Sequence, residues 1–293
     1  MNINNNFTPL AWHQGDIELQ SNRASYAYGH IVPLFASATT FLPFQIITAT
    51  GAVNAANADM RLMTVDGTVV GSNLWGSMGM TVVAENGFDV VIYNGTAINP
   101  GLPIGQYYLR LTSGNNTWYS DVVTIVADIT KYTRLTWWDA ADLLFGAGCV
   151  VYKYGTNNAT QYKNVMYFME EIGMPEYTQE EEGETRDGLF YASKLISGKK
   201  YKMQIAQASE AMCDAMRFIH LADWVEIWDG YGRHYLCDSV LVTPEWQTGA
   251  VASVAVEITT DTFVKSVGKG YITERQMTGI IGEAVIGQTF LIG

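Results

Sequence analysis

The chain has 293 residues, and its 17 basic and 29 acidic residues give it a net charge of −12. This charge argues against nonspecific binding to DNA or to an anionic membrane surface, because both depend on clustered Lys and Arg. Hydrophobic residues make up 48% of the chain and charged residues only 16%. We therefore expect an ordered, β-rich protein whose exterior is partly covered by neighbouring chains.

Residues 41–130 are predicted to form strands joined by turns, preceded by an N-terminal arm over residues 1–40. A β-prone segment spans residues 41–50. Two apolar runs within residues 60–70 flank Asp66-Gly67, a dipeptide that suits a hairpin turn because both residues tolerate positive φ. Further strands are expected at residues 80–84, 88–93, 105–112 and 117–126. Short strands at this spacing indicate a β-sandwich over residues 41–130.

The second part, residues 131–265, is expected to mix strands with a helix. Strands are predicted at residues 134–137, 199–205, 224–228, 236–243 and 250–258. The acidic run from Glu176 to Asp187 is interpreted as a solvated loop, because like charges repel and resist burial. The tail, residues 266–293, is predicted to be an extension that packs on a neighbour.

Residues 209–224 form the one predicted helix. Ser209 is placed to cap it with its hydroxyl. Met212, Ala215, Met216 and Ile219 then fall on one apolar stripe at helical spacing. The expected fold class is therefore a β-rich α+β protein, in which a β-sandwich is followed by a mixed α+β domain with one main helix.

Histidine and cysteine do not form a recognisable metal motif. The nearest candidate for a zinc site is His234 with Cys237, but the second ligand pair that such a site needs is missing. Cys213 and His220 lie about 10 Å apart along the predicted helix. These residues are interpreted as having no chemical role, and no metal or cofactor is expected.

The carboxylates offer a weak case for catalysis. Glycosidases use two carboxyl groups about 5–10 Å apart, and such a pair could come from Glu170, Glu171, Glu180, Glu181, Glu182 and Glu184. The run is contiguous and hydrophilic, however, and lacks the apolar surroundings that raise the pKa of one acid. A solvated or interface loop is favoured, and a glycan hydrolase is the weaker hypothesis.

The tryptophans leave three alternatives open. Trp137 and Trp138 are adjacent, so on a strand they face opposite sides, and one of them needs cover outside the core. Trp224 and Trp228 share a strand face. Core packing is the expectation for most of them, and the functional alternatives are a sugar-stacking platform and a subunit interface. The candidate interface residues are Trp138, Glu180, Glu181, Glu182, Glu184, Trp228 and Phe290.

Several segments of the chain resemble the motifs of one known protein family. Residues 102–108, LPIGQYY, and residues 117–126, TWYSDVVTIV, resemble the end of the Ig-like domain in that family. Residues 135–142, LTWWDAAD, and residues 162–167, YKNVMY, resemble two later signatures. The most specific match is residues 173–184, GMPEYTQEEEGE. Through these motifs the chain resembles the Ig-like-domain-containing structural proteins of the virions of crAss-like and related tailed phages of Bacteroidetes. The resemblance covers roughly residues 41–260 in order, and it departs at an apolar insert, residues 143–158, and in the tail.

The resemblance implies an Ig-like domain and a ring-forming protein of the phage tail, neck or baseplate, without enzyme activity. We expect identical chains to join head-to-tail into a closed ring, with twelve copies if the ring follows the portal. Other tail, portal or neck proteins are the expected partners, DNA passes only as cargo, and no membrane is involved. The expected location is the virion, after synthesis in the bacterial cytoplasm. The alternative is a glycan-binding tail or baseplate module.

Overall fold

A computed structural model describes most of the chain, and the fold is mostly β, with strands over 55% of it and a single α-helix in the described part. The described residues are 8–15, 34–85, 87–140, 142–144, 150–152, 162–186, 189–247, 251–260, 264–267, 276–281 and 284–289. Among them, no helix is long and apolar enough to cross a membrane. The prediction of a β-rich α+β protein, with a mixed α+β domain that contains one main helix, is therefore wrong.

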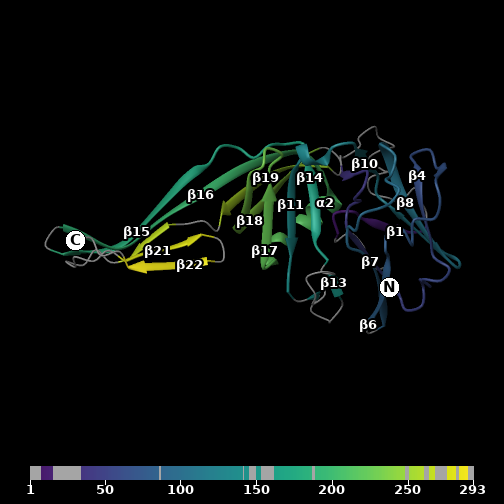
Figure 1. Cartoon of the computed structure of the whole chain (residues 1–293), viewed down its shortest axis with the longest axis horizontal. Helices are drawn as coiled ribbons and strands as arrows, with labels where there is room; N and C mark the ends of the chain where they lie inside the picture. Colours follow the sequence, from purple (N-terminus) through teal and green to yellow (C-terminus); the bar gives the residue numbers. More distant parts are fainter. Residues whose placement is uncertain are drawn as a thin grey trace.

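Two sheets make up the N-terminal lobe, residues 8–126 (Figure 1). The larger sheet has seven strands: β1 (Trp12–Gln14), β2 (Phe35–Ser37), β4 (Asp59–Thr64), β5 (Val69–Val70), β8 (Gly105–Ser113), β9 (Asn116–Ser120) and β10 (Val123–Val126). The smaller sheet has three: β3 (Phe44–Ala49), β6 (Thr81–Glu85) and β7 (Phe88–Tyr93). The described residues of the predicted N-terminal arm supply β1 and β2. An immunoglobulin-like strand order stays a prediction.

The turns of this lobe form where the sequence predicts them. β4 pairs with β5 across Asp66-Gly67, and Gly67 has a φ of 90°. β6 pairs with β7, and β8 with β9. Inward-facing residues of the two sheets then share one core, with Phe44 of the small sheet against Trp12 of the large one at a ring-centroid distance of 4.8 Å.

The C-terminal lobe, from residue 133 onward, is built on a ten-stranded sheet. In spatial order its strands are β14 (Asn164–Phe168), β11 (Thr133–Trp138), β17 (Trp224–Trp228), β18 (His234–Trp246), β19 (Val251–Thr260), β16 (Leu189–Ser209), β20 (Val264–Val267), β21 (Gln276–Ile281) and β22 (Ala284–Thr289). β15 (Glu176–Arg186) pairs with β16 beside this path. A short pair, β12 (Leu143–Leu144) and β13 (Val150–Tyr152), lies apart, and a 3-10 turn, η2 (Ile129–Lys131), connects the lobes.

The predicted helix forms, but it is much shorter than expected. α2 covers only Glu210–Met216, and Ser209 caps it by accepting a hydrogen bond from the backbone N–H of Met212 at 3.2 Å. Two helical turns are enough to bury the apolar stripe against β16 and β19. A 3-10 turn, η3 (Ile219–Leu221), follows, and residues 224–228 form β17, the strand that was predicted there. The helix has only 7 residues, which is one reason why the fold class differs from the prediction.

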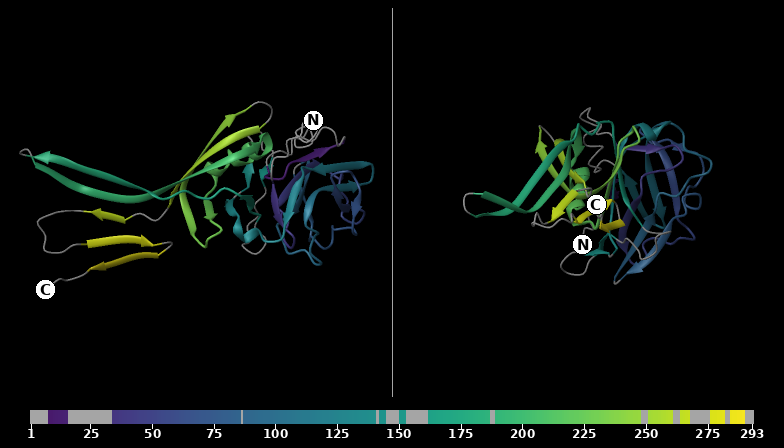
Figure 2. Two further views of the ribbon diagram at one scale, coloured as in Figure 1. Left: turned by 90° about the horizontal axis from the view of Figure 1, so that it is seen from above. Right: turned by 60° about the vertical axis from the view of Figure 1, so that its left-hand side comes forward.

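The prediction of a solvated loop at the acidic run is also wrong, because residues 176–186 form a strand. β15 and β16 make a long hairpin that stands off from the rest of the molecule, with β20–β22 continuing the same sheet beside it (Figures 1 and 2). We call β15, residues 189–199 of β16 and β20–β22 the arm; it is distinct from the N-terminal arm that was predicted over residues 1–40. The charges of β15 are tolerated in a strand because the arm is thin enough for both of its faces to reach solvent, and Glu180, Glu181 and Glu182 are all exposed.

The two lobes are joined through buried apolar side chains. One cluster extends from the sheets of the N-terminal lobe into β11, β14, β16, β19 and α2. A smaller cluster joins Val90 and Ile92 of β7 to Trp138 of β11 and to Tyr162. The lobes therefore pack as one body around the base of the arm.

Candidate functional site

The outer face of the sheet around β11 carries polar and aromatic side chains. Leu135 and Trp137 of β11 point into the core and are fully buried, so the alternate residues, Arg134 and Thr136, lie on the opposite face of the strand. The strand register then aligns outward residues of three neighbouring strands: Arg134 lies between Tyr167 of β14 and Trp228 of β17. The same alternation places Thr136 beside Val165 and Glu226.

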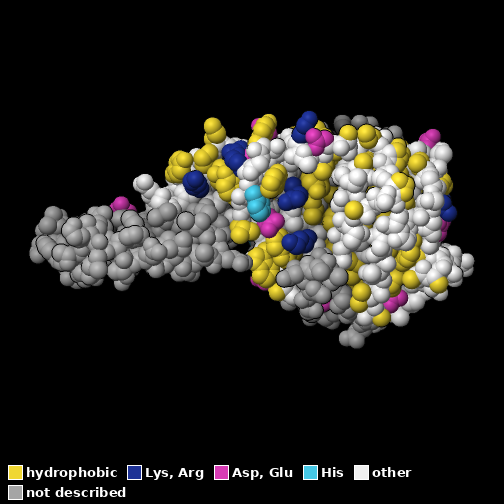
Figure 3. Space-filling view, viewed as in Figure 1, with side chains coloured by type: hydrophobic (Ala, Val, Ile, Leu, Met, Phe, Trp, Pro, Cys, Tyr) yellow, Lys and Arg dark blue, Asp and Glu magenta, His cyan; other side chains and the backbone are white. Residues whose placement is uncertain are grey.

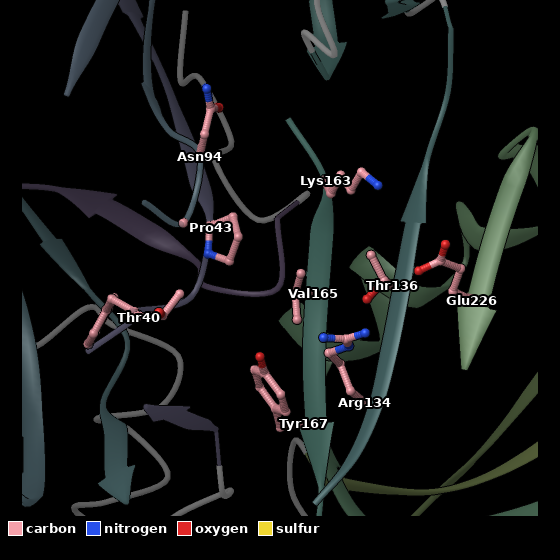
Figure 4. Close-up of a pocket in the computed structure, with 11 residues that line it drawn as sticks. Thr40, Pro43, Asn94, Arg134, Thr136, Lys163, Val165, Tyr167 and Glu226 are labelled. Carbon is pink, nitrogen blue, oxygen red and sulfur yellow. The ribbon is translucent and has the colours of Figure 1, made fainter. Parts of the chain in front are cut away.

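This face forms one wall of a pocket of about 290 Å³ between the lobes. Figure 4 shows side chains of β14, β11 and β17 on one side and Thr40, Pro43 and Asn94 of the N-terminal lobe on the other. We call this cavity the inter-lobe pocket, and its lining residues are Thr40, Phe41, Pro43, Asn94, Gly95, Arg134, Thr136, Lys163, Val165, Tyr167 and Glu226. On the surface, basic side chains gather with a histidine and an acidic side chain over the middle of the molecule (Figure 3).

Two cations of the pocket are held by aromatic rings. The Lys163 ammonium lies 3.5 Å from the ring centroid of Trp138, and the Arg134 guanidinium lies 5.8 Å from that of Trp228. Among the described side chains, no carboxylate lies within ion-pair distance of either cation. The carboxylate of Glu226, the acid of the pocket, lies instead 3.6 Å from Nε2 of His234.

Tyr167 adds a polar group to the same wall. Burial raises the pKa of its hydroxyl, and the positive charge of the neighbouring Arg134 offsets part of that increase. The phenol therefore stays protonated at neutral pH and can donate a hydrogen bond. Together with the two cations, it makes the pocket suited to a carboxylate or another anionic group.

The predicted interface residues fall in three places. Trp138 is 8% exposed and is covered by this chain's own β7, so it does not face a neighbour. Trp228 is half-buried on the outer face of β17, beside Arg134 and His234. The acidic residues lie on the arm, where Glu180, Glu181 and Glu182 are exposed; the backbone of Glu184 belongs to β15, and its side chain lies outside the described ones. Phe290 lies outside the described residues.

The other candidate groups are not brought together. Glu170 accepts a hydrogen bond from the backbone N–H of Ala206, and Glu171 accepts one from the hydroxyl of Tyr231. Cys213 is buried in α2, where burial raises the pKa of its thiol to about 11, and Cys237 lies on β18. In the part of the chain that the structure describes, no cluster of three or more His, Cys, Asp or Glu side chains could hold a metal ion.

Sequence reasoning missed Arg134, Lys163 and Tyr167. The signal for their shared face was present in the alternation of residues 133–138 and 163–167, where every second residue is core-facing. The alternation does not show which strands are neighbours in the sheet, because β14, β11 and β17 are not consecutive in the chain.

No protein-family model matches the chain, and no curated protein matches it either.

Proposed function

We propose that the chain is a structural subunit of a tailed-phage virion, and that copies of it join head-to-tail into a closed ring around a DNA or cargo conduit in the tail or neck. The observation that carries the proposal is the arm, together with the motif match at residues 173–184, which begins before β15 and covers most of that strand. The proposal assigns the chain no catalytic step. It rests on how the arm is built.

The arm is a single layer of sheet. Pairing joins β15, β16, β20, β21 and β22 in one row, and no second layer covers this row among the described residues (Figure 2). The sequence of β20–β22 is nonetheless rich in apolar residues, including Val264, Val267, Ile280, Ile281 and Ile286. A sheet of such a sequence is stable when another layer packs on it, and a second copy of the chain can supply that layer.

The arm also has an exposed edge. β15 pairs only with β16 in the described structure, so one row of its backbone N–H and C=O groups has no strand partner. Five charged residues from Glu176 to Glu184 discourage uncontrolled edge-to-edge pairing. A strand that pairs at this edge therefore has to match these charges.

The mass of the purified chain in solution tests this proposal. Mass photometry and native mass spectrometry should find one dominant closed species of several copies of the 32.4 kDa chain, and two-dimensional classes from electron microscopy should show a ring. A monomer that persists at high protein concentration, or an open series of sizes, would contradict the proposal. Deleting the arm should convert the ring to monomers that keep the fold of the lobes.

A second candidate function, a glycan-binding tail module, is favoured by one observation. Trp224 is 38% exposed, and it shares the outer face of β17 with half-buried Trp228. Exposed indole rings can stack on sugar rings. A glycan array with the wild-type chain and the Trp224→Ala variant tests this candidate: binding that the substitution abolishes would support it, and an array without any hit would end it.

A further inference from the structure

Two cations of the inter-lobe pocket and two carboxylates of β15 have no oppositely charged side chain within ion-pair distance among the described residues. Arg134 and Lys163 line the pocket, whose own carboxylate, Glu226, lies against His234. On the arm, Glu180 and Glu181 are exposed, and no described cation lies within 4 Å of either carboxylate. At the base of the arm the charge is balanced, because Glu176 accepts a hydrogen bond from the Lys202 ammonium at 2.9 Å.

We propose that the Glu180 and Glu181 carboxylates of one copy enter the inter-lobe pocket of a second copy and pair there with Arg134 and Lys163. The inference rests on the proposed ring and names the contact that closes it. An Arg guanidinium offers a fork of N–H donors to a carboxylate, and such charge-assisted pairs are short and directional. A pocket of about 290 Å³ admits side chains of an edge strand, but not a folded domain.

The occupant cannot be the chain's own arm. β15 leads away from the lobes, and the pocket opens between them (Figures 1 and 4). At about 3.3 Å per residue, Glu181 lies roughly 17 Å along the strand from Glu176. The carboxylates are thus presented away from their own body, where a neighbouring copy can receive them.

The arm and the pocket are different surfaces of one chain, so their contact can repeat head-to-tail from copy to copy. Such a contact closes into a ring when the rotation between copies is a simple fraction of a full turn. A two-fold dimer, in which each arm enters the pocket of the other copy, would use the same residues. The mass of the assembly distinguishes that dimer from a ring of more copies.

Charge reversal in the full-length chain tests the contact. Two double variants are needed, Glu180→Lys with Glu181→Lys on the arm and Arg134→Glu with Lys163→Glu in the pocket. Their combination keeps the net charge of −12, because two cations and two anions are exchanged. Exposed Glu245→Lys and Lys131→Glu serve as matched controls outside the arm and the pocket. Circular dichroism and the melting temperature report the fold of every variant, and the exposed arm substitutions should leave it unchanged.

Mass photometry over a range of concentrations gives the result. Each double variant should weaken association about tenfold or more, the combined variant should recover it, and the two controls should assemble as the wild type does. If the wild type forms rings that the arm variant forms equally well, the inference is overturned while the ring function stands. Loss of assembly in the pocket variant alone, or no recovery in the combined variant, would place another anion in the pocket and also overturn it. A wild-type chain that is monomeric throughout overturns both proposals.

Discussion

Trp138 and Trp224 stack across neighbouring strands, with ring centroids 6.0 Å apart and planes inclined by only 14°. Trp224 leaves part of its ring in solvent, whereas Trp138 is 8% exposed. The Trp138 ring also meets the Lys163 ammonium and packs with Val90 and Ile92 of β7. The Trp138 side chain thus links the ten-stranded sheet of the C-terminal lobe to the N-terminal lobe.

Replacing Trp138 should loosen the contact between the lobes. Trp138→Ala removes a buried ring, and large-to-small changes of this kind lower the free energy of unfolding by about 3–5 kcal/mol. Trp224→Ala removes a partly exposed ring of the same type and should cost clearly less. Urea unfolding of both variants measures the difference. Equal losses would mean that the stack, and not the packing against β7, carries the energy.

The turn between β17 and β18 should not accept a side chain at Gly230. A Cβ atom there would lie 2.4 Å from the backbone carbonyl oxygen of Lys131, and backbone cannot move aside as a flexible side chain can. Gly230→Ala should therefore lower the free energy of unfolding by about 1–3 kcal/mol. Gly76→Ala is the control, because a Cβ atom there meets nothing within 4 Å. A neutral Gly230→Ala variant would contradict the close approach.

Stability at alkaline pH should depend on a pair of tyrosines. The hydroxyl of Tyr201 lies 3.0 Å from that of Tyr235, and the rings stack at 4.9 Å. Burial, with the hydrogen bond to Tyr235, raises the pKa of Tyr201 from 10.0 to about 12. The folded state thus favours the neutral phenol. Its contribution is complete below pH 10 and is lost as the pH rises towards 12.

Tyr201→Phe isolates this contribution because it keeps the ring and removes the ionisable hydroxyl. Urea midpoints of the wild type should fall more steeply than those of the variant as the pH rises through this window. The two curves should therefore converge at high pH. A constant difference between them at every pH would contradict the raised pKa of Tyr201.

Local patterns were enough to predict much of the N-terminal lobe, and the reason is its short connections. Asp66-Gly67 fixes a two-strand unit by backbone preference alone, and the alternation in residues 105–112 gives β8 its buried face. The same reasoning misjudged the acidic run, because composition alone made it a loop. The run becomes a strand because it pairs with β16. Its like-charged side chains can be accommodated there because both faces of β15 are exposed to solvent.

The pocket was harder to predict for a different reason. Arg134 and Lys163 are brought together by pairing between β11 and β14, which the segment with β12 and β13 separates in sequence. The opposite wall comes from the other lobe, around Pro43 and Asn94. Single-strand periodicity indicates which residues face outward, but not which other strand they will face.

Asp229 should be the most sensitive polar position near the pocket. It is 1% exposed, and its carboxylate accepts hydrogen bonds from the backbone N–H groups of Tyr231 and Arg233 and from the Arg233 guanidinium. These bonds shape the turn that aligns β17 with β18. Asp229→Asn keeps the size of the side chain and removes its charge, so the buried N–H donors lose part of their acceptor, at a cost of about 1.5–3 kcal/mol.

Chemical denaturation of Asp229→Asn, with Asp238→Asn at an exposed position as the control, measures that cost. Because Glu226, Trp228 and His234 lie on the two strands that this turn joins, the variant should also assemble less well than the control at equal concentration. An Asp229→Asn variant as stable as the wild type would show that the turn holds its shape through the backbone bond between Asp229 and Arg233 alone.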